Sequence, residues 1–196
     1  MRPALDDASL DQLFRAARSY NRWAPELVPE KTIRDLYELL KWGPTAVNCT
    51  PARFVFVTGD EARSKLVGCV SPGNVVKVQT APVTAIIGMD EKFADKLPVL
   101  FPHMPNVADH FKDPDLVRTT MMRNSSLQGA YLLLAARALG LDGGPMSGFD
   151  HAKVDAAFFS GTSVKSNFLC ALGIGTNELL YPRNPRLPFE EACRIA

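Results

Sequence analysis

Three short segments of this 196-residue chain combine cationic, hydroxyl or amide side chains with a break in regular structure. The first, Arg18-Ser19-Tyr20-Asn21-Arg22, offers two guanidinium groups and three hydrogen-bonding side chains, which could hold an anion. The second runs from Gly43 to Pro51, and its Asn48 could approach a flat polar ring. The third, Gly143 to Asp150, has glycines where a bare backbone could lie against a ligand. Taken alone, each segment is better explained as an ordinary helix end or turn than as a binding site.

Other motifs of catalytic or cofactor sites match only in part, because the flanking residues that they require are missing. Gly173-Ile174-Gly175 follows a predicted strand, but no helix follows it to receive a pyrophosphate, which excludes a dinucleotide-binding turn. Ser147 lacks the G-x-S-x-G frame of a hydrolase nucleophile. The three histidines and four cysteines show no metal-ligand spacing, so we expect no metal site. Because the cysteines form no short pairs and no signal peptide precedes them, we expect a reduced, cytoplasmic protein.

The composition indicates one soluble domain over residues 1–196. Its 22 Lys and Arg against 21 Asp and Glu give a net charge of +1, and 46% of the residues are hydrophobic. A nearly neutral chain lacks the concentrated basic face that nucleic acids require, so we expect no nucleic-acid partner. The longest apolar runs are too short to span a membrane, so we expect no membrane association.

Hydrophobic periodicity predicts the elements that carry these segments. Helices are expected over residues 9–20, from about Pro29 to before Gly43, and over 60–69, 74–79, 114–139 and 150–158. Strands are expected over 53–58, 83–89, 141–146 and 167–174. This order favours an α+β fold with a mixed, mostly antiparallel sheet flanked by helices. We expect residues 90–113 to form a structured lid, and the proline-rich, extended tail 176–196 to be an arm that reaches across a dimer.

Together the motifs resemble the flavin-dependent nitroreductase superfamily over essentially the whole chain. The resemblance lies in an R-S-x-x-R-type start, a P-S-x-x-N-x-Q-P-type turn, an N-x-x-K helix and a G-P-x-x-G-F-D turn. The sequence of residues 41–45, 80–85 and 144–150 is similar to that of the RutE/HadB branch, which includes a malonic semialdehyde reductase of pyrimidine degradation. The resemblance implies a nitroreductase-like fold and an FMN at a homodimer interface.

The resemblance also assigns roles to individual residues. Arg18 and Ser19 match the first phosphate-binding motif, and Arg183 and Arg186 lie in the tail where the family keeps basic phosphate ligands. Asn21 belongs to the same set, although the family often has Lys or Arg there. The turn that the partner supplies matches Pro44, Thr45, Ala46 and Asn48, and the pyrimidine edge of the ring matches Asn74 and Lys77. Asn124 matches a side-chain amide near the ring. The backbone beside flavin N5 matches Pro145, Met146, Ser147 and Gly148. Thr50 and Ser147 depart from the usual Gln and from the Glu of several relatives.

The implied activity is ping-pong hydride transfer from NADH or NADPH through flavin N5, with no protein catalytic residue. Malonic semialdehyde, reduced to 3-hydroxypropionate, is the leading acceptor, and the candidate substrate residues are Phe101, His103, Arg118 and Arg123. One alternative is a nitroreductase or quinone reductase whose acceptor stacks beneath Phe93, Phe101 or Phe111. Alternatives of another class are a flavin-binding protein without turnover and a flavin-free structural dimer.

Overall fold

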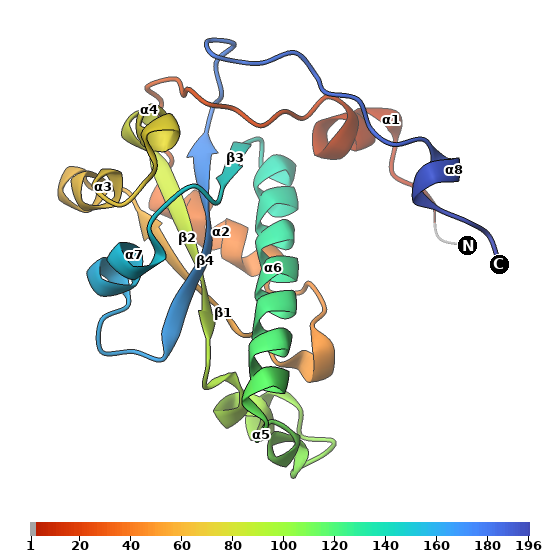
Figure 1. Ribbon diagram of the computed structural model, residues 1–196. Coiled ribbons are helices and arrows are strands. Elements are labelled where there is room, and N and C mark those ends of the chain that lie inside the picture. Colours follow the sequence, from red (N-terminus) through yellow and green to blue (C-terminus); the bar gives the residue numbers. More distant parts are fainter. Residues whose placement is uncertain (1–2) are drawn as a thin grey trace.

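Four antiparallel strands form the central sheet of the computed structural model, which describes residues 3–196 (Figure 1). They are β1 (Ala52–Val57), β2 (Val83–Asp90), β3 (Asp142–Met146) and β4 (Val164–Gly173), in the spatial order β1-β2-β4-β3. The sheet was predicted to be mixed, but every strand pair in it is antiparallel. The β-branched run of β2 suits its central position, since almost all of its residues are buried.

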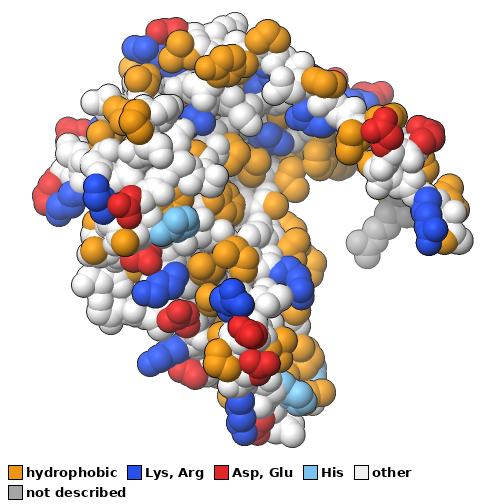
Figure 2. Space-filling view, viewed as in Figure 1, with side chains coloured by type: hydrophobic (Ala, Val, Ile, Leu, Met, Phe, Trp, Pro, Cys, Tyr) orange, Lys and Arg blue, Asp and Glu red, His pale blue; other side chains and the backbone are white. Residues whose placement is uncertain are grey.

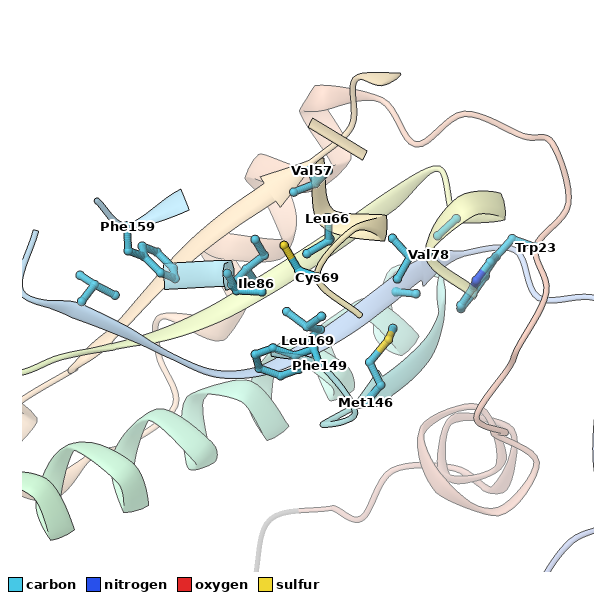
Figure 3. Close-up of a cluster of buried hydrophobic side chains, with 14 residues drawn as sticks. Trp23, Val57, Leu66, Cys69, Val78, Ile86, Met146, Phe149, Phe159 and Leu169 are labelled. Carbon is cyan, nitrogen blue, oxygen red and sulfur yellow. The ribbon is translucent and has the colours of Figure 1, made fainter. Parts of the chain in front are cut away.

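Helices cover both faces of this sheet. On one face lie α3 (Asp60–Val67), α4 (Val75–Thr80) and α7 (His151–Phe158), and their apolar residues pack against Ile86 and Leu169 of the sheet (Figure 3). On the other face lie α2 (Glu30–Leu40) and the long α6 (Pro114–Ala138), which bury a second cluster with Ala85, Ile87 and Leu172. The sheet therefore separates two hydrophobic layers, as expected for an α+β fold.

Several predicted elements are confirmed with small shifts in their limits. Helix α6 begins at Pro114 behind Asp113, whose side chain accepts a hydrogen bond from the Asp115 amide, and the chain turns at Gly140 with φ +78°. Asp150 caps α7 as expected, accepting from the Lys153 amide at 3.0 Å. The last strand begins at Val164, three residues earlier than predicted, and α4 follows a 3-10 turn at Pro72–Asn74.

The first helix is the main error. Helix α1 covers Asp7–Leu10 and continues as a π turn over Asp11–Arg15, whereas the pattern predicted a helix to residue 20. Beyond Arg15 the backbone runs beside β3, where the Tyr20 amide donates to the Gly143 carbonyl at 3.3 Å. These tertiary bonds replace the helical ones. The helix is capped by Asp6, whose carboxylate accepts from the Ser9 amide.

Residues 90–113, the predicted lid, contain three short helical segments. They are η4 (Phe93–Lys96), α5 (Leu97–Leu100) and η5 (Val107–His110), which share a small core with Met121 of α6. Cys49, which directly follows the 3-10 turn η2 (Ala46–Asn48), packs into the same core. This core therefore joins the lid to the turn that precedes β1.

Both ends of the chain extend away from the sheet in a projection that overhangs α6 (Figure 1). The tail was predicted to be wholly extended, but Phe189–Ala192 forms one helical turn, α8. Leu187, Phe189 and Ile195 of this tail are exposed. Figure 2 shows the concave space between the projection and the body. Within residues 3–196, no helix is long and apolar enough to cross a membrane.

Candidate functional site

A hollow of about 440 Å³ lies between the two chain ends and the last turn of α6. We call it the anion hollow because four arginines and no carboxylate line it. The lining also includes hydroxyl and amide side chains; its polar residues are Arg18, Ser19, Asn21, Arg137, Tyr181, Arg183, Asn184 and Arg186. None of the four guanidinium groups forms an ion pair among the residues that the structure describes. The hollow therefore has the charge and the donors to hold a phosphate-sized anion.

The predicted phosphate ligands are brought together by bonds between the two ends of the chain. Arg18 donates to the Tyr181 carbonyl, Arg183 donates to the Ala17 carbonyl at 3.0 Å, and Asn21 donates to the Leu179 carbonyl at 3.0 Å. These carbonyl acceptors hold the side chains without neutralising their charge. All five residues predicted for the phosphate line the same hollow, although they come from segments more than 150 positions apart.

A second group of predicted residues lies beside β3. Lys77 on α4 is only 7% exposed, and burial lowers its pKa. Asn74 donates to the Gly148 carbonyl at 2.9 Å, which fixes the segment that follows β3. A Cβ added at Gly144 would lie 2.5 Å from the Tyr20 carbonyl oxygen and 3.3 Å from Lys77 Cδ. The N-x-x-K pair, the segment after β3 and the first motif therefore form one continuous surface, which we call the cradle.

The structure corrects two details of this group. Gly143 and Gly144 were expected to leave backbone bare for a ligand, but their missing side chains leave room for the chain's own Leu133 and Tyr20. The Met146 side chain belongs to the buried core, so only its backbone is left to face a ligand. Pro145 is half-buried and Ser147 is exposed.

The segment from Pro44 to Ala52 forms a strained turn that α6 holds. Val47, Asn48 and Thr50 all have positive φ, between 34° and 50°. Three side chains of α6, spaced i, i+4 and i+7, bond to its backbone. Asn124 accepts from the Ala46 amide at 2.8 Å, Gln128 accepts from the Ala52 amide at 2.9 Å, and the Tyr131 hydroxyl donates to the Pro44 carbonyl at 2.9 Å. Such bonds keep a costly backbone conformation in place.

Other predicted residues of the turn also bond within the chain. Thr45 accepts from the Thr50 amide at 3.1 Å, and Asn48 donates to the Leu100 carbonyl of the lid at 2.8 Å. The second end of the Asn124 amide donates to the Thr120 carbonyl at 2.8 Å. Burial raises the pKa of the neighbouring Cys49 thiol to about 11. The turn is thus a preformed surface coupled to the lid.

The turn and the cradle do not meet in one chain. Asn74 and Lys77 flank the α3–α4–α7 face of the sheet, whereas the turn is attached to α6 on the opposite face. Asn124, which holds the turn, precedes Arg137 of the anion hollow by 13 residues of continuous helix, about 20 Å at 1.5 Å per residue. The structure therefore presents two separate groups of predicted cofactor residues.

The candidate substrate residues are scattered around the lid and the first half of α6. Arg118 pairs with Asp115 at 3.0 Å, while Arg123 is exposed and forms no ion pair within the described chain. Phe101 packs edge-on to His103, with ring centroids 5.7 Å apart. Phe93 is fully buried and contacts Phe111 edge-on at 5.0 Å, so the Phe93 ring is not free to cover a flat acceptor.

Sequence reasoning missed Arg137, Gln128 and Tyr131. Gln128 and Tyr131 lie at helical spacing from the predicted Asn124, a signal that could have found them. Arg137 in the last turn of a long helix is typical of a cation that favours the helix dipole, and its place in the hollow had no sequence signal.

Comparison with known proteins identifies what this architecture is similar to. The model of the nitroreductase family matches residues 3–176. A protein of Stenotrophomonas maltophilia named as an NADH dehydrogenase/NAD(P)H nitroreductase is 60% identical over 197 residues, covering 100% of both chains. HadB of Ralstonia pickettii, with the same type of name, is 55% identical over 96% of this chain and 97% of its own.

Solved structures share the fold at lower identity. A nitroreductase of Exiguobacterium sibiricum in complex with FMN superimposes with a TM-score of 0.82 at 20% identity, covering 100% of this chain and 99% of its own. A Bacillus subtilis nitroreductase, ydfN, gives a TM-score of 0.85 at 20% identity, covering 97% of this chain and 100% of its own. Both similarities show the nitroreductase-like fold predicted from the sequence.

Proposed function

Because this chain belongs to the nitroreductase family, we propose that it is an FMN-dependent NAD(P)H oxidoreductase that works as a homodimer. The observation that carries the proposal is the cradle next to the anion hollow, with a buried lysine and with four arginines that form no ion pair within residues 3–196. The names of close relatives, which specify NADH or NAD(P)H, support the reductant, and a fold neighbour solved with FMN supports the cofactor.

The residues present fit FMN. Its phosphate would bind in the anion hollow, where Arg18, Arg183 and Arg186 offer charge-assisted hydrogen bonds. Lys77 and Asn74 would face the pyrimidine edge of the ring, which gains negative charge on reduction. When bound, FMN supplies the hydride chemistry, accepting a hydride from NAD(P)H and passing it to the acceptor. The chain binds and orients the reactants, and needs no nucleophile of its own.

A second copy of the chain would complete each site. The turn at Pro44–Asn48 lies on the opposite face of the sheet from the cradle, so a flavin in the cradle needs the turn of a partner to cover it. The exposed apolar tail, with Leu187, Phe189 and Ile195, supports an arm that packs on that partner. Sedimentation should therefore show a dimer, and a monomer would refute this arrangement.

Mixing two inactive variants tests the shared site directly. We expect Lys77→Met to damage the cradle and Asn48→Ala to damage the turn. In a mixed dimer, one site carries both defects and the other carries neither, so remixing the two variants should restore activity to about a quarter of wild type, by random pairing. If the cradle and turn of one chain formed one site, every mixed dimer would remain inactive.

For the acceptor we propose malonic semialdehyde, reduced to 3-hydroxypropionate. The resemblance to the RutE/HadB branch and the 55% identity to HadB support this assignment. Arg123, exposed beside the residue that holds the turn, is the candidate for the acceptor's carboxylate. The names of the relatives favour a second candidate, a nitroaromatic or quinone acceptor.

Absorbance and kinetics distinguish these functions. The purified protein should be yellow, and anaerobic NADH or NADPH should bleach it; a yellow protein that is not bleached would be a flavin-binding protein without turnover. The FMN-loaded enzyme should then oxidise NAD(P)H faster with malonic semialdehyde than without it. If only nitroaromatics or quinones accelerate the oxidation, the semialdehyde assignment is wrong and the second candidate holds.

A further inference from the structure

Arg137 differs from the other arginines of the anion hollow in where it comes from. Arg18, Arg183 and Arg186 lie on the irregular chain ends, whereas Arg137 lies in the last turn of the 25-residue helix α6. In Figure 1 the end of α6 points toward the overhanging chain ends. A side chain on a long packed helix is held more rigidly than one on an extended tail.

The contacts of Arg137 hold its side chain in place but leave one of its hydrogen-bond donors without an acceptor. Its Nη1 donates to the Leu13 carbonyl at 2.7 Å, and its own backbone carbonyl accepts from Gln12 Nε2 at 2.6 Å. Its Nε–H is buried and has no hydrogen-bond partner, one of two such side-chain atoms in residues 3–196. Buried donors in native proteins are nearly always satisfied, so an unsatisfied one indicates a missing acceptor.

The charge of Arg137 is also poorly compensated. Burial lowers its pKa, and only Cys170 and Asp142 act in the opposite direction. The Cys170 thiol is itself buried, and its pKa is raised to about 12, so the group is neutral near pH 7. Asp142 accepts from the Gly175 amide at 2.9 Å, and no ion pair between Asp142 and Arg137 is present among residues 3–196. Arg137 is a half-buried cation without a direct counterion, and an anion bound next to it would stabilise its charge.

We propose that Arg137 is a phosphate ligand of the anion hollow and that it makes the site discriminate phosphorylated from unphosphorylated flavin. This inference rests on the proposed function. The guanidinium group has five N–H donors, of which the Leu13 carbonyl occupies one, so donors remain for a phosphate oxygen. The long helix α6 would hold this donor in place independently of the arginines on the tail. The phosphate would thereby connect α6 to both chain ends.

The test compares FMN with riboflavin, which lacks the phosphate, in Arg137→Met and wild type. Flavin fluorescence quenching on the apoprotein measures both dissociation constants. Loss of charge-assisted bonds predicts roughly 10- to 100-fold weaker FMN binding and less than about threefold change for riboflavin. Arg34→Met is the matched control, because Arg34 is an exposed arginine of α2 that pairs with Glu30 at 2.5 Å. That variant should bind both flavins as wild type does.

Equal weakening of both flavins would show that Arg137 only supports the fold, and an unchanged FMN affinity would also overturn the proposal. If Arg137→Met does not fold, Arg137→Lys keeps the charge and most of the stem. It should lose part of the preference for FMN over riboflavin and keep riboflavin binding; an unchanged preference would refute the proposal. A wild-type protein that shows no preference for FMN would refute the phosphate site itself, and with it the proposed cofactor.

Discussion

Lys77 is a buried cation whose removal should stabilise the empty protein while weakening its cofactor binding. The side chain is 7% exposed, and no hydrogen bond or ion pair to its ammonium group is present among residues 3–196. Its backbone carbonyl accepts from Trp23 Nε1 at 3.2 Å, and its stem lies against Gly144. Lys77→Met keeps an apolar stem of similar length and removes the charge, so packing is largely retained.

The magnitude follows from the cost of burying a charge without a partner. Replacing buried ionic groups by apolar ones of similar volume is often stabilising by about 1–4 kcal/mol. For a single cation that is not fully enclosed we take about 1–2 kcal/mol. At roughly 2–4 °C of Tm per kcal/mol for a chain of this size, the apoprotein should melt roughly 2–8 °C higher.

The effect should also depend on pH. Burial places the pKa of Lys77 in the folded chain below its ordinary value of 10.5. Between these two pKa values the unfolded chain binds more protons, so the free energy of unfolding of wild type rises with pH. Below the folded pKa both states are protonated and the penalty is complete. The advantage of Lys77→Met is therefore largest near neutral pH and shrinks as the pH approaches about 10.5.

Urea unfolding of the apoproteins near pH 7 and near pH 10 measures both effects, with Lys65→Met as the control. Lys65 is an exposed lysine of α3, paired with Glu61 at 2.8 Å, and its loss should change stability by less than about 1 kcal/mol. FMN should bind Lys77→Met roughly 10- to 100-fold more weakly. An apoprotein destabilised by the change near pH 7 would refute the reasoning, since it would show that the ammonium group already has a partner.

Three further outcomes follow from contacts in the site. Gln128→Leu leaves the buried Ala52 amide without its 2.9 Å acceptor and should lower the free energy of unfolding by about 1–3 kcal/mol; an unchanged urea midpoint would contradict this. Gly148→Ala adds a Cβ 2.7 Å from Asn74 Nδ2, so FMN should bind several-fold more weakly by fluorescence titration, and wild-type affinity would show that the segment can shift freely. Cys193 is exposed and the other three cysteines are buried, so a thiol reagent should modify one group rapidly in the native protein; two rapid groups would disprove the burial.

The sheet and its long helix could be predicted from the sequence because their signals are local. The β-branched run at 83–89 and the apolar spacing before Gly140 each determine an element without reference to the rest of the chain. The first helix could not be predicted correctly, because residues 17–21 bond to β3 and to the tail. Its apolar periodicity continues to Ala17, but tertiary bonds decide where it ends.

In the candidate site, too, some residues could be predicted from the sequence and others depend on tertiary contacts. Asn74, Lys77 and the arginines of both chain ends were assigned by family resemblance, and the fold brings each set together. The side chains of α6 that hold the turn from Pro44 to Ala52 were not all predicted. Gln128 and Tyr131 lie at helical spacing from Asn124, but their partners in the turn depend on which backbone groups α6 faces after folding.

The bonds between the chain ends set the order in which this protein can be assembled during synthesis. Arg183 bonds to the Ala17 carbonyl across 166 positions, and Arg18 bonds to Tyr181. The ribosome makes the chain from its amino end, and the last strand ends at Gly173, so every strand of the sheet is synthesised before the tail. The anion hollow acquires its second wall only when the last residues emerge. A chain released before residue 180 would therefore contain all four strands and the cradle but would not retain a phosphorylated cofactor.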